Sequence, residues 1–396
     1  MDNFIKLDKF NKVILSKYFI KKFNPDNIIL STLLAFYMNL GCQKYPTEEK
    51  LYYFLQYNYD LSYEITPYQV GSYDIFRYRL SAVNPKLIND DDYNESFLID
   101  SFNEFLKPVI VNNTFSQELL DKAKEIYSSE IYYSYEDHET IATNNALNYY
   151  FKDTLYSYKR IPNIYDVYKV TPKDLYNYYL SLQNEYNTSY ILGDLDFIEP
   201  KSSNSIILDS HLFIDRGICS SKIIEKKKTN QAYLRVIYDG NIFSNDKLFY
   251  PALFINQAFG GSTNSKLFLK IREELALCYS ISSSYYASSG ILLVSAIINK
   301  NDVDKVIEEI DKIYTELLDD FDLEFIKNQF IYDKLEELDN INTYLANEFY
   351  DSHFPYMQKS SSEIEIIKSI VNEDIINAYS KLKRKFVYVY GGDLDE

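Results

Sequence analysis

Apolar and polar residues alternate near the start of the chain, with the two-residue period of a half-buried strand. We predict this strand over residues 13–20, before the turn residues Asn24-Pro25. A helix is predicted next, because the apolar residues after Asp26 share one helical face and Gly41 stands where a left-handed residue ends a helix. Those apolar residues are Ile28, Ile29, Leu33, Phe36 and Leu40.

The rest of the first half is predicted as a strand pair followed mainly by helices. Residues 61–83 are rich in Tyr, Ile, Phe and Val around Gly71-Ser72, which indicates two antiparallel strands joined by a turn. Helical patterns dominate residues 96–159, a short helix follows at 170–182, and a strand follows at 189–192.

The second half repeats this order of elements. The pattern predicts a strand at 232–238, helices at 247–259 and 267–275, strands at 279–286 and 291–298, helices at 303–318 and 324–352, and a strand at 386–390. In the last long helix, apolar residues from Phe325 to Leu338 are expected to face the core.

The repeat also appears in the residues themselves. Gly193-Asp-Leu-Asp returns as Gly392-Asp-Leu-Asp, a lag of 392 − 193 = 199, and the helix start at Asp174 returns at Asp374, a lag of 374 − 174 = 200. Two such features within matching element orders favour tandem duplication of an α+β unit. We therefore expect two domains, 1–210 and 211–396.

Composition narrows the class of ligand and the compartment. A formal net charge of −17 excludes a nucleic-acid partner, which needs a clustered basic surface, and suits a cationic peptide better. Three widely spaced cysteines speak against a disulfide framework. The chain shows neither an apolar leader nor the run of about 18 apolar residues that a membrane span requires. We expect a soluble, cytoplasmic protein that does not contact a membrane.

Two segments of the second half carry a recognisable motif order. Phe259-Gly-Gly-Ser-Thr-Asn-Ser-Lys-Leu-Phe268 is followed by Ile271-Arg-Glu-Glu-Leu-Ala-Leu-Cys-Tyr279. This order resembles the C-terminal half of the insulinase/pitrilysin-type (inverzincin) metallopeptidases. In the first half, Gly41-Cys-Gln-Lys-Tyr-Pro-Thr47 is similar to the loop that follows the zinc helix of that family. The resemblance implies two α/β-roll halves, each a mainly antiparallel sheet covered by helices.

The resemblance also locates the family's zinc motif in this chain. Active members carry His-x-x-Glu-His on the first helix, where two imidazoles bind zinc and the Glu activates water. Counting back from Gly41, those places hold Thr32, Ala35 and Phe36. Neither Ala nor Phe offers a ligand atom, so no metal site and no catalytic residue are expected here. Glu118 and Glu125, on the helix where the third ligand would lie, are interpreted as ordinary exposed acids.

The family's substrate-holding Arg and Tyr are matched in type and order by Arg272 and Tyr279. An Arg can donate to a peptide carbonyl or a developing oxyanion, and a Tyr hydroxyl adds a neutral donor. The competing interpretation is that Arg272 is a helix-surface charge and Tyr279 a core aromatic of a strand.

Three functions follow from these expectations. The first is a non-catalytic subunit of a heterodimeric metallopeptidase, with zinc only in a sister chain and with roles such as peptide-bacteriocin maturation or elongation factor P modification left open. The second is a peptide-binding or scaffold protein without any role in hydrolysis. An independent enzyme with relocated chemistry is the weakest, because the sequence shows no Gly-x-Ser-x-Gly, phosphate-binding loop or Cys/His cluster.

Overall fold

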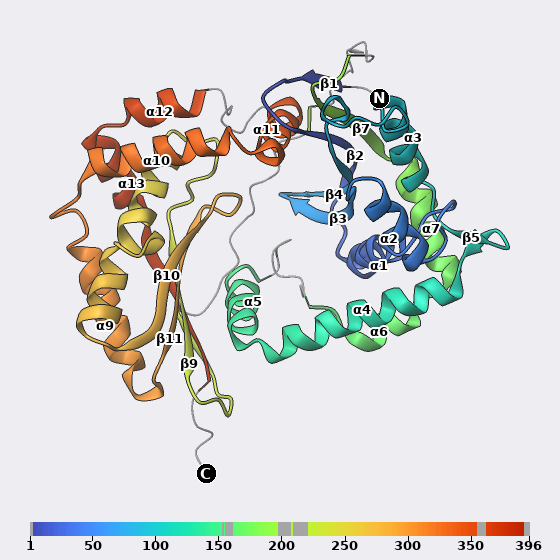
Figure 1. The fold of residues 1–396 in the computed structure, drawn as a ribbon. Coiled ribbons are helices and arrows are strands. Elements are labelled where there is room, and N and C mark those ends of the chain that lie inside the picture. The colour runs from blue at the N-terminus through green and yellow to red at the C-terminus, as the bar shows by residue number, and fades with distance from the viewer. Residues whose placement is uncertain are drawn as a thin grey trace. The chain divides into compact units, whose positions relative to one another are not determined.

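The computed structural model describes residues 3–152, 154, 161–196, 207–208, 221–354 and 362–391. The chain divides into two compact units (Figure 1). Unit 1 comprises residues 1–133, 161–206 and 341–345, and unit 2 comprises residues 134–160, 207–340 and 346–396. The boundary expected at residue 210 lies outside the described residues and stays a prediction.

Unit 1 is built on a five-stranded sheet with the strand order β1-β7-β2-β4-β3. The strands are β1 (Asn3–Lys6), β2 (Lys12–Lys22), β3 (Ser62–Val70), β4 (Tyr73–Val83) and β7 (Tyr186–Gly193). β1 and β7 pair in parallel, whereas the other neighbours are antiparallel. The predicted strand pair is confirmed as β3 and β4, joined at Gly71, whose φ of +56° is one that glycine adopts without strain.

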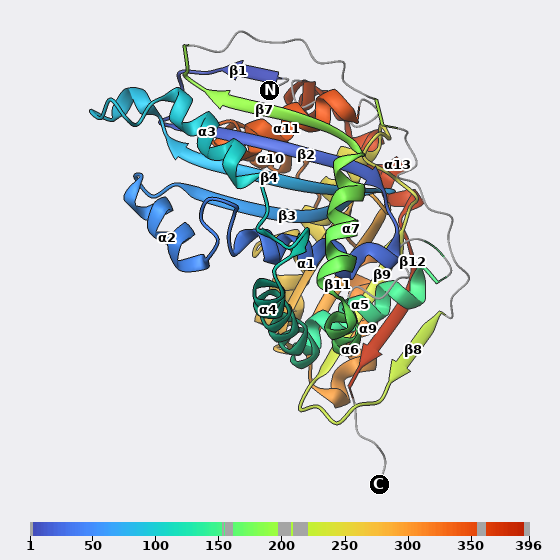
Figure 2. The same ribbon diagram turned by 90° about the vertical axis from the view of Figure 1, so that its right-hand side faces the viewer.

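Helices cover one face of this sheet. Residues of the same parity on β2, among them Val13, Leu15 and Phe19, form a single core with the helices, whose ribbons are drawn in Figure 2. The elements that accompany the sheet are η1 (Pro25–Asn27), α1 (Ile28–Asn39), α2 (Glu48–Tyr57), η2 (Pro85–Leu87), α3 (Glu95–Phe105), the hairpin β5 (Ile110–Val111) and β6 (Thr114–Phe115), α4 (Gln117–Glu136), α6 (Ile164–Lys169) and α7 (Pro172–Gln183).

Unit 2 has a sheet of the same design, with the order β10-β11-β9-β12-β8. Its strands are β8 (Lys222–Glu225), β9 (Ala232–Asp239), β10 (Cys278–Tyr286), β11 (Ile291–Ile298) and β12 (Lys383–Tyr390). As in unit 1, the four-residue strand pairs in parallel with the last long one, and the rest are antiparallel. The repeated strand order confirms the predicted α+β fold of two tandem halves.

The repeat extends to the helix that precedes the last long strand of each half. Asp174 in α7 accepts a hydrogen bond from the backbone N–H of Thr171 at 2.9 Å, and Asp374 in α13 (Asn372–Lys381) accepts one from Val371 at 3.0 Å. Each carboxylate therefore satisfies an N–H at the start of its helix. The matching stretch at 392–395 lies outside the described residues.

The helices of unit 2 differ from expectation in two places. The predicted helix over 324–352 is two helices, because Asp339 and Asn340, whose side chains compete for backbone hydrogen bonds, lie between α10 and α11. Within α10, Phe325 and Leu335 are each 51% exposed, so their expected place in the core is wrong. The elements are α8 (Phe249–Asn256), the π-helical turns η3 (Gln257–Gly261) and η4 (Phe268–Glu274), η5 (Lys300–Asp302), α9 (Val303–Thr315), α10 (Leu323–Glu337), α11 (Ile341–His353), which begins in unit 1, and α12 (Glu363–Ser369).

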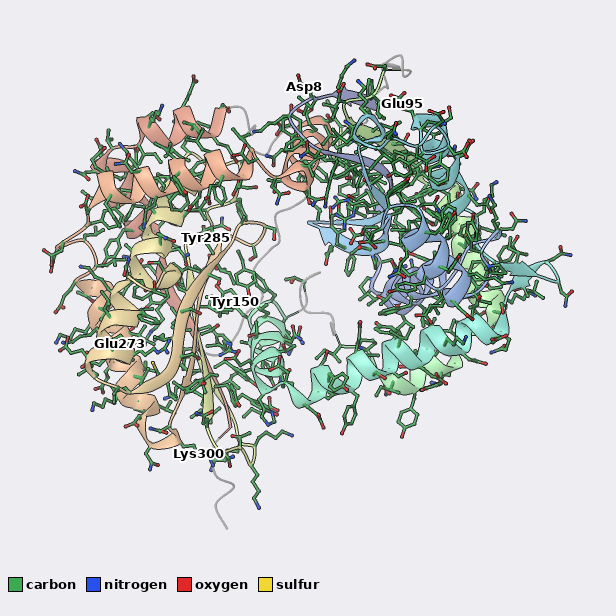
Figure 3. All side chains as sticks on the ribbon, viewed as in Figure 1. Asp8, Glu95, Tyr150, Glu273, Tyr285 and Lys300 are labelled. Carbon is green, nitrogen blue, oxygen red and sulfur yellow. The ribbon has the colours of Figure 1, made fainter. Side chains whose placement is uncertain are left out.

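The second face of the unit 2 sheet is covered by α5 (His138–Tyr150). Arg235 on β9, only 2% exposed, donates to the hydroxyl of Thr143 at 2.9 Å and to the carbonyl of Glu139 at 3.0 Å. Tyr150, labelled in Figure 3, donates to the carboxylate of Asp239. A helix from the first half of the sequence is thus fixed to the second sheet by buried polar contacts as well as by apolar packing.

The described residues contain no helix that is both long enough and apolar enough to cross a membrane.

Candidate functional site

The three positions of the zinc motif lie together on α1. Thr32 and Phe36 are half-buried and four residues apart, so both lie on one face of the helix, and Ala35 is 5% exposed. The end of α1 is fixed on the sheet, because the side-chain amide of Asn39 donates to the carbonyl of Ile65 at 3.1 Å and accepts from its N–H at 2.9 Å. The end of the helix that carries these three positions is therefore held against β3.

A tyrosine from α4 contacts both of the residues that we predict at the family's imidazole positions. The ring of Tyr127 packs on Phe36 with 5.6 Å between ring centroids, and its hydroxyl shares a hydrogen bond with the Thr32 side chain. Tyr127 is 6% exposed and belongs to the core of unit 1. Burial raises the pKa of its phenol, and the Thr32 hydrogen bond offsets part of that rise. Tyr127 is therefore a neutral packing group here.

The residues around this position do not fit zinc. Glu118 and Glu125, on the same helix as Tyr127, are exposed, and Glu118 lies 3.7 Å from Lys122 in an ion pair. Across the described parts of the chain, no three His, Cys, Asp or Glu side chains come close enough to hold a metal ion. A tetrahedral zinc site needs three such protein ligands, and α1 together with α4 offers none at the motif position.

A cluster of polar residues lies on the other side of α1. The Lys21 ammonium donates to the hydroxyl of Tyr178 at 2.7 Å and lies 4.1 Å from the centre of its ring, while Ser31 on α1 also hydrogen-bonds Tyr178. Asp74 pairs with Lys21 in the strand register. Burial raises the pKa of Asp74 to about 6, against the opposing effect of the Lys21 charge. Because these groups contact one another, we interpret the cluster as a structural network that supports α1.

Arg272 and Tyr279, the two predicted substrate contacts, lie on either side of a tight corner in unit 2. Arg272 is in η4 with its side chain 44% exposed, and its guanidinium lies 4.7 Å from the ring centre of Phe268. Tyr279 is the second residue of β10 and is 74% exposed, so its interpretation as a core aromatic is wrong. Burial raises the pKa of the thiol of Cys278, the neighbour of Tyr279, to about 11, and the Arg272 charge offsets part of that rise. Both side chains are thus available to a ligand from the same corner.

Two features of the backbone shape this corner. A Cβ on Gly260 would lie 2.8 Å from the backbone nitrogen of Ser283 on β10, so only glycine lets η3 approach the strand this closely. Ala276, between Arg272 and Tyr279, has a φ of +49°, a left-handed conformation that costs an alanine free energy. The corner therefore holds its shape against local backbone strain.

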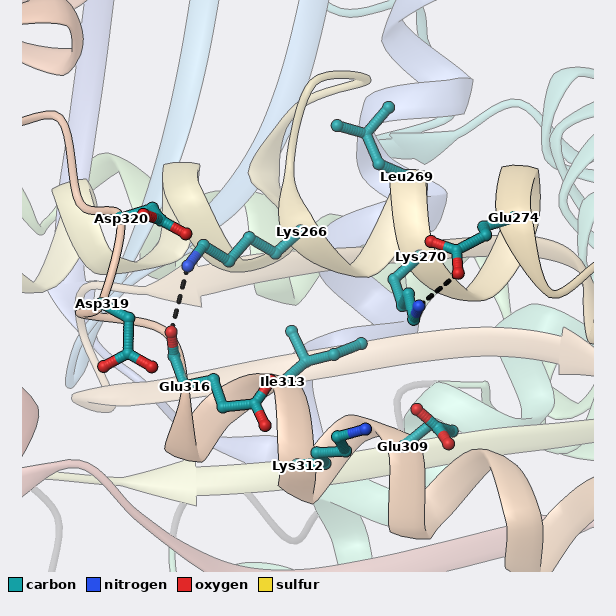
Figure 4. A pocket seen from close by; sticks show the side chains of 10 residues that line it. All are labelled: Lys266, Leu269, Lys270, Glu274, Glu309, Lys312, Ile313, Glu316, Asp319 and Asp320. Atoms are coloured by element: carbon teal, nitrogen blue, oxygen red, sulfur yellow. Dashed lines mark hydrogen bonds and ion pairs between the residues drawn. The ribbon is translucent and has the colours of Figure 1, made fainter.

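A pocket of about 390 Å³ lies elsewhere on unit 2, between η4 and α9 (Figure 4). Two of its three lysines are engaged with their neighbours: Lys270 pairs with Glu274, and Lys266 donates to the backbone carbonyl of Glu316 at 3.0 Å. Neither Arg272 nor Tyr279 lines it.

The histidines do not form a site. His138 packs between the rings of Tyr233 and Tyr390, and His353, 1% exposed, packs on Phe349. His211 lies outside the described residues.

Known proteins support the resemblance seen in the motifs. Residues 191–330 match a family model described as "Peptidase M16 inactive domain", M16 being the insulinase/pitrilysin type. A Bacillus subtilis (strain 168) protein named "Probable inactive metalloprotease YmfF" is 23% identical over 416 residues, covering 98% of this chain and 95% of its own.

Solved structures share the fold. A conserved protein from Enterococcus faecalis V583 superposes with a TM-score of 0.85 at 21% identity, covering 99% of this chain and 96% of its own. The periplasmic protease PqqL from Escherichia coli superposes with a TM-score of 0.67 at 11% identity, covering 96% of this chain but 42% of its own. The matched family model and the named relative are both described as inactive forms of this peptidase type, and this chain is similar to them.

Proposed function

The chain is a homologue of the insulinase/pitrilysin-type (M16) zinc peptidases that lacks their catalytic motif, and we propose that it is the non-catalytic subunit of a heterodimeric peptidase of this type. In this proposal a zinc-bearing sister chain supplies the metal and the general base. This chain supplies Arg272 and Tyr279 and helps to bind the peptide substrate.

The proposal rests on a contrast between the two halves. Tyr127 packs at the predicted motif position of unit 1, so that position leaves no room for a metal. Arg272 and Tyr279 in unit 2 are exposed, although an exposed tyrosine gains little stability from its position. Loss of one half of a catalytic site with retention of the other is expected of a chain whose missing half is provided by a partner.

A longer single-chain protease that shares the fold supports a two-chain assembly. This chain aligns with 42% of the PqqL chain, so that protease carries a second length of comparable size within one polypeptide. A sister subunit would supply the equivalent length here. The proposed compartment is the cytoplasm, in keeping with Cys42 and Cys278, which are free thiols.

A peptide-binding or scaffold protein without any role in hydrolysis is the second candidate. The packing of Tyr127 at the predicted motif position supports this second function equally well, because a protein that only binds peptide needs no metal. The two candidates differ in whether Arg272 and Tyr279 affect the rate of bond cleavage or only the affinity for peptide.

Hydrolysis of a quenched fluorescent peptide tests the proposal. The purified chain, a sister protein from the same genome that carries His-x-x-Glu-His, and an equimolar mixture of the two are compared. We expect activity in the mixture to exceed the sum of the separate activities. Arg272→Ala should lower kcat of the mixture by about a hundredfold, because it removes a donor aimed at charge that develops in the transition state.

Matched variants exclude general damage. Lys305→Ala removes another exposed cation of unit 2, and Tyr165→Phe removes the hydroxyl of a tyrosine that is 77% exposed, close to the 74% of Tyr279. Both should leave the rate unchanged, whereas Tyr279→Phe should lower it. A mixture no more active than the sister alone would favour the scaffold function, and zinc-dependent activity of this chain alone would refute both.

A further inference from the structure

Two arginines lie side by side on the face of the unit 1 sheet that is opposite α1. Arg77 and Arg79 are two residues apart on β4, so their side chains share one face, and that face is not the one in the helix-covered core. In the strand register, Arg77 lies between Tyr18 on β2 and Thr66 on β3, and Arg79 lies between Ser16 and Glu64.

This pair has more positive charge than its surroundings balance. The Arg77 Nη2 donates to Glu64 Oε1 at 2.5 Å, and the same oxygen lies 3.8 Å from Nη1 of Arg79. Nη1 of Arg79 also donates to the neutral amide oxygen of Asn342 at 2.9 Å. One carboxylate therefore serves two guanidinium groups, since their other close contacts are to neutral side chains.

Both guanidinium groups also have an unused donor. Nε of Arg77 and Nε of Arg79 are buried and have no hydrogen-bond partner among the described residues. Arg79 is 9% exposed as a whole. A buried N–H without a partner costs free energy, and the cost is larger on a charged group. Two cations with one shared counter-ion and two spare donors have the composition of an anion receptor.

The site can be reached from the edge of the sheet. β3 is the edge strand, and its Glu64 side chain is 47% exposed while that of Arg77 is 19% exposed. The ring of Tyr68, also on β3, lies 5.8 Å from the Arg77 guanidinium. A ligand at this edge would meet Arg77 first and would compete with Glu64 for it.

We propose that Arg77 and Arg79 form a binding site for a peptide carboxylate, either an acidic side chain or a free C-terminus. The planar guanidinium fork binds a carboxylate through two parallel hydrogen bonds, which is the geometry that the spare donors can complete. The ligand's carboxylate displaces that of Glu64, which swings to solvent. This site requires no sister subunit, so it can fail or hold independently of the proposed heterodimer.

The positive charge of this site is opposite in sign to the net charge of the protein. With a net charge of −17, the long-range field favours cationic peptides. The arginine pair acts only at short range and would select, among bound peptides, those that present a carboxylate at one position. We expect the long-range preference to fade with added salt and the preference at the partly buried pair to persist.

Fluorescence anisotropy with the full chain alone tests the proposal. The probes are three labelled Ala/Ser-based peptides: one with a central Glu and an amidated C-terminus, its Gln counterpart, and a neutral peptide with a free C-terminal carboxylate. We expect the Glu or the free-carboxylate peptide to bind about tenfold more tightly than the amidated Gln peptide. Whichever of the two gains affinity identifies the source of the carboxylate.

Two substitutions at this site should have opposite effects on peptide binding. Glu64→Gln removes the competing carboxylate and should tighten binding of the preferred peptide several-fold, a gain that misfolding cannot produce. Arg77→Gln should abolish the preference. The matched control Asp311→Asn frees Arg384, which also pairs with its carboxylate at 2.5 Å but has no second arginine in that ion pair, and should change nothing. Equal affinities for all three peptides in wild type and in Glu64→Gln would overturn the proposal, as would an equal gain in Asp311→Asn.

Discussion

Tyr127 packs its ring against Phe36, with 5.6 Å between the ring centroids and 36° between the ring planes. Phe36 holds the place of the second imidazole of the family's motif, and Thr32, which hydrogen-bonds Tyr127, holds the place of the first. The predicted motif position is therefore part of the core of unit 1, and its packing does not depend on a metal ion.

Replacement of Tyr127 tests that interpretation. Tyr127→Ala should lower the free energy of unfolding by about 3–4 kcal/mol, because it leaves a cavity beside Phe36. Tyr127→Phe should cost no more than about 1 kcal/mol, since only the hydrogen bond to Thr32 is lost. Urea unfolding followed by circular dichroism measures both. Equal losses for the two variants would show that the hydroxyl, not the ring, maintains this region.

Restoring the motif should not restore a metal site. In Thr32→His, Ala35→Glu, Phe36→His the two imidazoles would lack a third protein ligand, because Glu118 and Glu125 are exposed, and Tyr127 would obstruct the position. We expect no stoichiometric zinc by elemental mass spectrometry after dialysis, and no peptidase activity. A single Phe36→His variant serves as the control for the lost packing. One tightly held zinc in the triple variant would contradict this account.

Asp74 gives unit 1 a stability that depends on pH. Its pKa rises from 3.8 to about 6 on folding, so the protonated form is favoured by the native state. This contribution is complete below the unfolded value and is lost as the pH rises through about 6. The facing charges are Lys21, which opposes the shift, and Glu185, which acts on Lys21.

Asp74→Asn removes that titration. Relative to wild type, the variant should gain about 1 kcal/mol in stability between about pH 5 and pH 7.5, after allowance for the solvent screening of a half-buried carboxyl. Thermal unfolding of both proteins across this range measures the difference. A difference that stays constant with pH would exclude Asp74 as its source.

Ala276 carries removable backbone strain. Its φ of +49° is unfavourable for alanine and acceptable for glycine, so Ala276→Gly should raise the free energy of unfolding by about 1 kcal/mol. Ala252→Gly in α8 is the matched control, and it should lower stability by about the same amount because it loosens a helix. Equal destabilisation by both changes would mean that the corner between Arg272 and Tyr279 is unstrained.

The sequence predicted those parts of the fold that depend on local pattern. β2 follows from the alternation of apolar and polar residues, and the β3–β4 and β10–β11 pairs follow from apolar segments interrupted by a turn glycine. β1 and β8 were missed because each has only four residues and pairs in parallel with a strand more than 150 residues away. The sequence of a four-residue segment does not identify a partner strand so far away in the chain.

The residues of the candidate site also divide into those that the sequence could locate and those that it could not. Thr32, Ala35 and Phe36 could be located by counting from Gly41, because they lie on α1 and Gly41 follows just after the end of that helix. Tyr127 could not, since its role comes from the packing of α4 on α1, and nothing in its own segment marks it. Arg77 and Arg79 left one usable signal, two arginines at alternate positions of an apolar strand.

Native mass spectrometry of this chain mixed with its zinc-bearing sister tests the central claim most directly, because it reports complex formation and bound metal together. Our account predicts an equimolar complex that holds a single zinc, with none on this chain when it is measured alone. Zinc bound to the isolated chain, or a mixture in which the two proteins stay separate, would contradict it.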